Sequence, residues 1–258
     1  MTAVTHRQSA GTALDLAWMC IVAVAHLAHG RYPLIVAANR DERHARPSAA
    51  ADWWHGPGTL LAGRDLAAGG TWLGVTGSGR FAAVTNIFEP GAARAPHSRG
   101  ALVTAYLLGT STPSEHAAAI AREGARYGPF NLVLGAGDAL HFASNRQASA
   151  ALLPGIHVLS NNAPGLKWPK VGALAATLEH AAARDDPHEF LIETLSGPAA
   201  RGPLERAADS LFVVGETFGT RCTTVLTVDA AGRARFVEQR FGAGGAATGR
   251  SEHVFALA

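Results

Sequence analysis

The stretch "CIVAVAHLAHGRYPLIVAANRDE", residues 20–42, decides how the rest of the chain is interpreted. Residues 20–27 and 34–39 are rich in β-branched and small apolar side chains, which is typical of buried strands. The segment "HGRYP" between them supplies turn residues, so the two runs are predicted to form a hairpin. A cysteine opens the first strand and the polar run "NRDE" closes the second. A thiol and several charged groups are therefore expected at one end of this hairpin.

Strand runs occur in pairs along the rest of the chain, and helical patterns occur in two blocks. Hairpins are predicted over 71–87 about "GSG", over 130–144 and over 223–241 about "DAAG", with single strands at 157–161 and 253–258. Helices are predicted over 98–108, 112–126, 170–184 and 187–195, the second with a capping box at Thr112 and Glu115, and 242–249 is predicted as a flexible loop. This separation favours an α+β fold of two mainly antiparallel sheets with helices outside.

Composition excludes several classes of protein. The chain has 258 residues, of which 48% are hydrophobic and 16% charged, so a large core is expected and global disorder is not. The net charge of +2 is made of scattered arginines, which gives no sign of a nucleic-acid partner. No run approaches the roughly 20 apolar residues of a membrane span. Two cysteines make no disulfide framework and favour a reducing, cytoplasmic location.

The first 18 residues carry no clear period and are predicted to be an N-terminal extension ahead of a single domain over 19–258. A secretory signal is disfavoured, because the apolar run at 16–25 is short and follows Asp15 directly. We expect that Met19 is the initiator or that residues 1–18 are removed, which would leave Cys20 first after loss of the methionine.

Familiar catalytic motifs are absent from the sequence. It has no G-x-S-x-G elbow, Walker loop, H-E-x-x-H or C-x-x-C, and no Rossmann glycine pattern follows a strand. The histidines are dispersed, and His26 and His29 are interpreted as solvated residues of a turn. No metal site is expected.

Polar residues do recur where predicted strands end or begin. The run Asn39, Arg40, Asp41 and Glu42 ends the second strand, and single residues follow at the ends of others: Asn86, Asn161 and Arg221. Each alone is an ordinary turn residue. Together with Cys20 they form a set that can attack a carbonyl group.

The chemistry of this set needs no histidine. A thiol reacts as the thiolate, and a neighbouring cation lowers its pKa. If Cys20 were the first residue, its own α-amine, with a pKa of about 7.7–8.0, would act as general base at neutral pH. Asp41 would then hold the amine, and the Asn86 and Asn161 amides would donate to the oxyanion.

These residues carry a resemblance to the NRDE family, also called the transport and Golgi organization 2 family. The likeness runs from Met19 to the C-terminus. Its landmarks are Met19-Cys20, "AANRDE" (37–42) with Arg46-Pro47, Trp54, "GGTWLGV" (69–75), Thr85-Asn86, Ser98-Arg99-Gly100, "FNL" (130–132), "LSN" (159–161), Trp168 with Lys170, and "GTRCTT" (219–224).

The family is similar in turn to N-terminal-nucleophile (Ntn) hydrolases of the penicillin V acylase and bile-salt hydrolase group. That resemblance implies an αββα sandwich and a cysteine hydrolase acting on an amide or thioester of a small acyl substrate, with no cofactor required. It implies catalytic roles for Cys20, Arg40, Asp41, Asn86, Asn161 and Arg221. Arg40 and Asp41 are adjacent here and separated in the acylases, and neighbours on a strand point to opposite faces.

Two other interpretations stay open. The family is also associated with intracellular haem trafficking and acyl-lipid handling, which implies a non-enzymatic carrier of haem or an acyl lipid in the same pocket. In that case Asn39 and Glu42 would position the ligand. In the other interpretation, Cys20 is a small buried hydrophobe at a strand start.

The tryptophans and the second cysteine complete the set. Three tryptophans lie in or near the Gly/Pro-rich stretch after "NRDE": Trp53, Trp54 and Trp72. They either cap the core or form an apolar wall for a ligand. In the second case Trp54 and Trp72 are the predicted ligand-binding residues. Cys222 is expected to face the core, away from Arg221, and to be inert. Oligomeric state is not indicated by the sequence.

Overall fold

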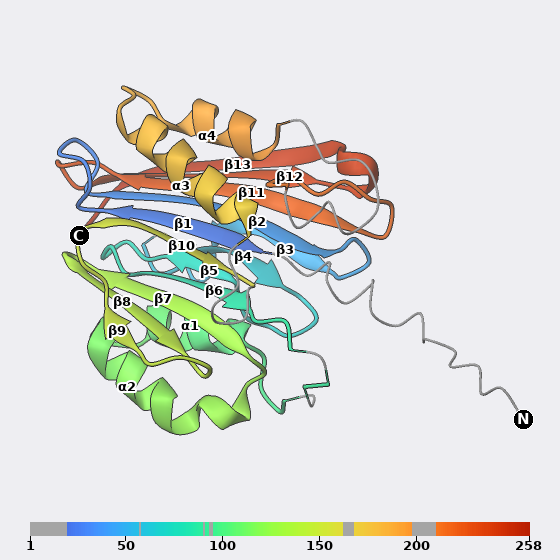
Figure 1. Cartoon of the computed structure of the whole chain (residues 1–258). Helices are drawn as coiled ribbons and strands as arrows, with labels where there is room; N and C mark the ends of the chain where they lie inside the picture. The colour runs from blue at the N-terminus through green and yellow to red at the C-terminus, as the bar shows by residue number, and fades with distance from the viewer. Residues whose placement is uncertain (1–19, 57, 90, 93–94, 162–167, 198–209) are drawn as a thin grey trace, which may run out of the picture.

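The architecture has four layers, in which two antiparallel sheets pack face to face and two helices cover each outer side (Figure 1). The computed structural model describes residues 20–56, 58–89, 91–92, 95–161, 168–197 and 210–258. The extension 1–18 and Met19 lie outside the described residues. The predicted α+β sandwich of antiparallel sheets is confirmed.

The first sheet contains the opening hairpin at its centre. Its strands, in spatial order, are β10 (Gly155–Ser160), β1 (Ile21–His26), β2 (Leu34–Arg43), β11 (Phe218–Val228), β12 (Arg233–Phe241) and β13 (Ala247–Ala256). All pairings are antiparallel, and β1 pairs with β2 from Ile21↔Asn39 to His26↔Leu34. The polar run "NRDE" therefore lies at the same end of the sheet as Cys20.

The second sheet follows chain order throughout. Its strands are β3 (Ser48–Trp53), β4 (Leu61–Asp65), β5 (Leu73–Val75), β6 (Phe81–Asn86), β7 (Phe130–Ala136), β8 (Ala139–Ser144) and β9 (Ala150–Ala151). These pairings are also antiparallel.

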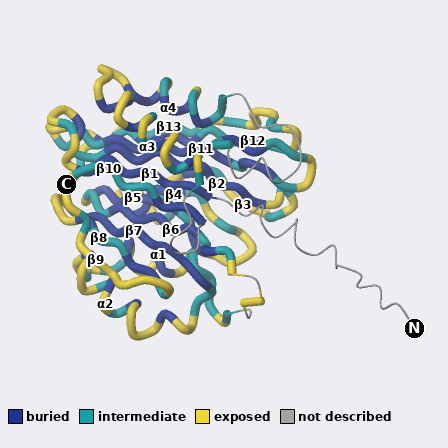
Figure 2. Tube along the Cα trace, viewed as in Figure 1, coloured by how far each residue is buried: buried dark blue, intermediate teal, exposed yellow. Residues whose placement is uncertain are grey.

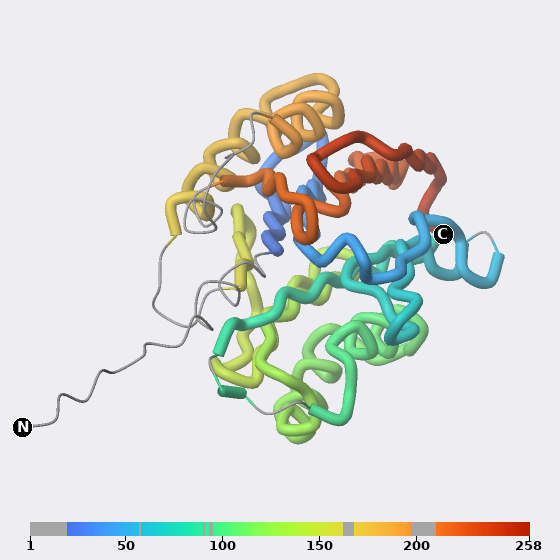
Figure 3. Tube along the Cα trace, turned by 90° about the vertical axis from the view of Figure 1, so that its right-hand side faces the viewer, coloured from blue at the N-terminus to red at the C-terminus, as the bar shows by residue number. Residues whose placement is uncertain are grey.

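Helices α3 (Pro169–Ala182) and α4 (His188–Leu195) cover the first sheet, and α1 (Gly100–Leu108) and α2 (Pro113–Glu123) cover the second (Figures 1 and 3). Two short 3₁₀ turns are η2 (Gly124–Arg126) and η4 (Ala243–Gly245). The capping box predicted at the start of α2 is present, with Thr112 and Glu115 each bonding the backbone of the other. Burial is concentrated in the strands, and exposed residues gather in loops and on outer helix faces (Figure 2).

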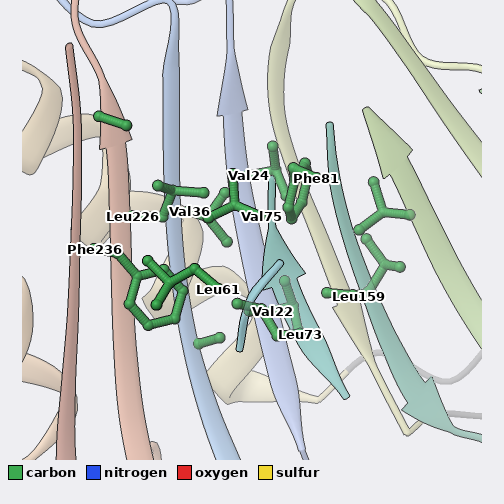
Figure 4. Close-up of a cluster of buried hydrophobic side chains, with 14 of the residues drawn as sticks. Val22, Val24, Val36, Leu61, Leu73, Val75, Phe81, Leu159, Leu226 and Phe236 are labelled. Carbon is green, nitrogen blue, oxygen red and sulfur yellow. The ribbon is translucent and has the colours of Figure 1, made fainter. Parts of the chain in front are cut away.

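The alternation of side chains along β1 decides where Cys20 points. Val22 and Val24 belong to the core between the sheets, together with Val36, Leu73 and Phe81 (Figure 4). Ile21 and Ala23 instead pack against α3 and α4. Because successive side chains on a strand face opposite sides, Cys20 faces the space between the sheets.

Some elements differ from the sequence prediction. β3 and β4 were not predicted, because "SAAADW" and "LAGRD" are rich in alanine and glycine, show little β-branching, and pair through an irregular register. The segment predicted as a loop over 242–249 is shorter, since β13 begins at Ala247. His26 is not a solvated turn residue: it ends β1, is buried, and lies 3.2 Å from the carbonyl oxygen of Asp138.

Candidate active site

A row of side chains crosses the first sheet on its inner face. Cys222 on β11 pairs with Arg40 on β2 and with Arg240 on β12. On β1, Ile21 pairs with Asn39 of β2 and with Ser160 of β10. Continuing both registers by one residue places Cys20 between Arg40 and Asn161. The row therefore runs from Asn161 through Cys20, Arg40 and Cys222 to Arg240, and all five residues line one pocket.

This pocket has a volume of about 1030 Å³. The second sheet and its loops supply the opposite wall, which includes Trp72, Asn86 and Arg99. Its size suits a small organic ligand or an acyl chain, since ligand pockets commonly measure about 300–1,000 Å³.

Cys20 is buried at the inner end of this pocket, and its Sγ donates a weak hydrogen bond to the carbonyl oxygen of Asp41 at 3.6 Å. The pKa of the Cys20 thiol is raised to about 11, first by burial and then by the Asp41 carboxylate, while Arg40 acts in the opposite direction. A pKa raised in this way favours the protonated thiol at neutral pH in a chain that continues into residue 19.

Arg40 belongs to a group of four charged side chains, here called the inner ion-pair network: Arg40, Glu42, Arg46 and Asp65. Arg40 Nη2 lies 3.7 Å from Glu42 Oε2 and 3.8 Å from Asp65 Oδ2, and Arg46 Nε donates to Asp65 Oδ2 at 2.7 Å. Two cations and two carboxylates balance, so the network holds Arg40 in place beside Cys20 without adding net charge.

Asp41 contacts residues different from those of its neighbour Arg40, as strand alternation requires. Thr220 Oγ1 donates to Asp41 Oδ1 at 2.6 Å, while the buried Oδ2 has no hydrogen-bond partner among the described residues. Burial outweighs the lowering effects of Lys170, Thr220 and Arg40, so that the pKa of Asp41 is raised to about 6. Asp41 is thus a buried carboxyl group with one acceptor oxygen unused.

Asn39 lies away from the pocket lining, under the helices. Its Nδ2 donates to the carbonyl oxygens of Leu195 at 2.8 Å and Leu211 at 2.6 Å, and its Oδ1 accepts from Thr223 at 2.6 Å. These bonds anchor α4 to β2 and β11. Asn39 was predicted to position a ligand, but it does not line the pocket. Glu42, which was given the same predicted role, does line it.

Asn86 and Asn161 come together from different sheets. Asn86 ends β6 and Asn161 follows β10, and both line the pocket. Two hydrogen bonds join the ends of strands β6 and β10. Phe88 N donates to the Asn161 carbonyl oxygen at 3.1 Å, and Thr85 Oγ1 donates to the Ser160 carbonyl oxygen at 3.1 Å.

Arg221 occupies the bulge in the β2–β11 ladder. Its Nη1 donates to the carbonyl oxygens of Arg43, His44 and Arg46 at 2.9–3.1 Å, and Nη2 lies 3.3 Å from Ser48 Oγ. Arg221 borders the pocket, and these hydrogen bonds fix the connection between β2 and β3.

Cys222 is buried, as expected, but it faces the pocket rather than a separate core. Cys222 stands opposite Arg40 in the register that continues to Val228, and the bulge at Arg221 shifts the residues that precede it. Burial raises the pKa of Cys222 well above its usual value, and Glu238 adds to this effect.

The tryptophans separate into two roles. Trp72 lines the pocket. Trp54 does not line the pocket but packs against the core beneath α1 and α2, where its Nε1 donates to the carbonyl oxygen of Ala62 at 2.9 Å. The Arg64 Cζ atom lies 4.7 Å from the centroid of the Trp54 ring. Trp53 packs edge-on against Phe255 with ring centroids 5.0 Å apart.

Sequence reasoning gave no role to several charged residues of the site. Asp65 and Arg240 come to the pocket only through tertiary pairing, and no local pattern marks them, whereas Arg46 stands in the landmark Arg46-Pro47 without an assigned role. Arg99 was noticed within "SRG" as a family landmark, without a function. Among the residues described, no group of three or more His, Cys, Asp or Glu side chains could hold a metal ion, and no helix has the length and hydrophobicity to cross a membrane.

Comparison with solved structures finds a similar fold. The Caenorhabditis elegans N-acylethanolamine-hydrolyzing acid amidase (NAAA) ortholog aligns with a TM-score of 0.52 over 80% of this chain and 92% of that one. Their sequences are 15% identical, so the likeness establishes the fold alone.

The sequence relatives are closer. The chain is 32% identical over 239 residues to a bovine (Bos taurus) transport and Golgi organization protein 2 homolog and 31% identical over 238 residues to the human (Homo sapiens) one, in both cases across 81% of this chain and 86% of the relative. The model of the Transport and Golgi organisation 2 family matches residues 19–243. The chain belongs to this family.

Proposed function

We propose that the protein is a cysteine Ntn hydrolase that cleaves an amide or thioester bond of a small acyl substrate through Cys20. The observation that carries the proposal is the pairing of a pocket thiol with a buried, half-satisfied carboxyl group. Cys20 contacts the backbone of Asp41, and Asp41 Oδ2 has no partner among the described residues. When Cys20 is the first residue, its α-amine would become an ammonium cation beside this oxygen on accepting the thiol proton.

The reaction follows from these groups. The α-amine accepts the thiol proton, and Sγ attacks the carbonyl carbon of the substrate to give a tetrahedral oxyanion. The amides of Asn86 and Asn161 donate to that oxygen. The bond to the amine or thiol leaving group then breaks, and the α-ammonium returns the proton to it. Water, activated by the same amine, hydrolyses the Cys20 thioester and releases the acid.

The test is acylation by an activated ester. A protein that begins at Cys20 is mixed with p-nitrophenyl octanoate, and release of nitrophenol is followed together with the intact mass. We expect a burst of about one nitrophenol per chain and one octanoyl group on Cys20. Cys20→Ser should abolish the burst, and Cys222→Ser is the matched control that should retain it. Acylation of both cysteines at equal, slow rates would reject the nucleophile assignment.

A carrier function is the second candidate. It is favoured for a chain that retains residue 19, because the raised pKa of Cys20 makes this thiol a poor nucleophile. With residue 19 present, the pKa of Cys20 is raised to about 11, and a pocket of about 1030 Å³ with Trp72 in its wall is available for a haem or acyl-lipid ligand. Titration of haem and of a long-chain acyl-CoA should then quench tryptophan fluorescence saturably, and Trp72→Phe should reduce the quenching. Absence of saturable quenching by either ligand would contradict this function.

A further inference from the structure

Arg99 stands apart from the other arginines of the pocket. It is the N-cap residue of α1, and its Nη1 donates to the carbonyl oxygen of Pro129 at 3.1 Å. Within the described part of the chain it forms no ion pair with a carboxylate. A guanidinium group has five N–H donors. The nitrogens of Arg99 that make no hydrogen bond are not buried, and Arg99 lines the pocket, so these N–H groups are open to it.

The other guanidinium groups of this pocket lie beside carboxylates or carbonyl oxygens of the protein itself. Arg40 and Arg46 share the two carboxylates of the inner ion-pair network. Arg240 Nη1 lies 3.5 Å from Glu238, and Arg221 is bonded to three carbonyl oxygens. Among the described residues, Arg99 thus combines a place in this pocket with donors left over for a ligand and no carboxylate beside it to compete for them.

The backbone holds Arg99 in position. A Cβ atom at Gly70 would come within 2.6 Å of the Gly100 carbonyl carbon, so the start of α1 is pressed directly against the chain between β4 and β5. A Cβ at Gly128 would lie 3.5 Å from Arg99 Nη1, which shows that the guanidinium rests on bare backbone. A guanidinium fixed in this way loses little side-chain freedom when it binds an anion.

Arg99 also lies within electrostatic range of the reacting thiol. Its charge interacts with Cys20 and Glu42, and burial lowers the pKa of Arg99 while the Cys20 and Glu42 charges raise it. A substrate whose carbonyl carbon reaches Cys20 can therefore place a nearby anionic group on Arg99. Two parallel N–H···O bonds from a guanidinium suit a carboxylate or a phosphate.

We propose that Arg99 is a specificity-determining residue that binds a carboxylate or phosphate carried on the amine or thiol portion of the acyl substrate, a few bonds from the carbonyl that Cys20 attacks. The reaction in this statement rests on the function proposed above, whereas the anion preference is a binding property that needs no chemistry. The substrates are then anionic acyl derivatives rather than neutral ones such as N-acylethanolamines.

Calorimetric binding to the full chain carrying Cys20→Ser measures this preference without turnover. The probes are N-octanoylglycine, N-octanoylethanolamine and the phosphate monoester of the latter, which share one acyl chain and differ in charge. We expect at least about tenfold tighter binding of one or both anionic probes than of the neutral one. The ratio between the glycine and phosphate probes identifies which anion the site takes.

Arg99→Gln should bring the anionic probes down to the affinity of the neutral one, and Arg99→Lys should retain part of the preference. Arg64→Gln is the matched control, because Arg64 is exposed on the same pocket and should change the ratio by less than about twofold. Equal affinity for all three probes in the parent chain overturns the proposal whether or not any Arg99 variant folds. A preference for the anionic probes that survives in Arg99→Gln also overturns the proposal, because Arg99 would then not be the group that binds the anion. Failure of acylation at Cys20 is a separate result and rejects the hydrolase function alone.

Discussion

Arg40 and Cys222 face each other directly across strands β2 and β11, and Cys20 lies on the other side of Arg40 at the start of β1. One cation is thus flanked by two thiols on the same face of the sheet. The cysteines are two strands apart, about 10 Å, which exceeds the reach of about 7 Å for a disulfide. Both are free thiols. The arrangement is a shared cation between two cysteines rather than a redox pair.

Arg40→Gln is therefore expected to slow iodoacetamide labelling of both cysteines. From the sequence, by contrast, Cys222 was expected to be inert and to face the core. Arg40 lowers the pKa of each thiol in the structure, so losing the charge should reduce each thiolate fraction by about three- to tenfold, equivalent to about half to one pKa unit. Peptide mass mapping after timed labelling measures the two rates, with Arg64→Gln as the control. An unchanged rate at Cys222 would show that its contact with Arg40 has no electrostatic consequence.

Exposure of the Cys20 α-amine should activate its thiol. In a chain that retains residue 19, labelling of Cys20 should be very slow at pH 7.5 and rise about tenfold per pH unit up to about pH 10, because the pKa is raised to about 11. In a chain that begins at Cys20, the ammonium group replaces an amide beside Asp41 and favours the thiolate. We expect labelling at least about 30-fold faster at pH 7.5, from a drop of at least about 1.5 pKa units.

The comparison uses the two chains side by side, with Cys222 in each as the internal reference. Identical pH profiles for Cys20 in both chains would mean that its amine exerts no influence on the thiol, and the general-base role would fail with it.

Asp41 should make the longer chain less stable as pH rises. Its pKa is raised from 3.8 to about 6 in the folded chain, so between these values the folded state binds more protons than the unfolded state. The free energy of unfolding therefore falls with increasing pH across this window, by up to about 3 kcal/mol at about 1.4 kcal/mol per pKa unit. Asp41→Asn should remove this part of the dependence.

Urea unfolding at intervals from pH 4 to pH 7 measures the effect. Asp185→Asn is a suitable control, since the side chain of Asp185 is fully exposed. If Asp41→Asn and Asp185→Asn give parallel curves, the buried carboxyl group does not carry the predicted proton.

Arg221 is expected to act on stability more than on chemistry. Arg221→Ala removes the hydrogen bonds to three carbonyl oxygens and to Ser48, which should lower the free energy of unfolding by about 2–3 kcal/mol. Arg221→Lys should recover only part of this loss, because an ammonium group cannot span the same carbonyls. The rate of Cys20 labelling should change by less than about threefold. A large loss of labelling in a variant of normal stability would return Arg221 to the catalytic set.

The opening hairpin, the antiparallel layers and the Cys20–Arg40 pairing follow from local patterns, because β-branched runs and turn residues specify strand partners that are close in sequence. The site residues of the second sheet do not follow in this way. Asp65 is brought to Arg40 by β4, whose "LAGRD" lacks a strand pattern, and Arg99 reaches the pocket through the docking of α1. Cys222 shares its face with Leu226 of the core between the sheets, and the packing of the second sheet makes this end of that face a pocket.

Asn86 offers the sharpest test of oxyanion stabilisation because the chain supplies a matched residue beside it. Asn86 ends β6 with its side chain at the pocket, whereas Asn131 on the adjacent strand β7 donates through Nδ2 to the Ser160 carbonyl at 3.1 Å. Removing one oxyanion donor typically lowers the rate by about 100- to 1,000-fold. We therefore expect Asn86→Ala to slow acylation by p-nitrophenyl octanoate to this extent and to change the free energy of unfolding by less than about 1 kcal/mol. Asn131→Ala should do the reverse, with a loss of about 1–2 kcal/mol in stability and a nearly normal acylation rate. Equal slowing in both variants would mean that the amide of Asn86 supports the wall of the pocket and does not contact the oxyanion.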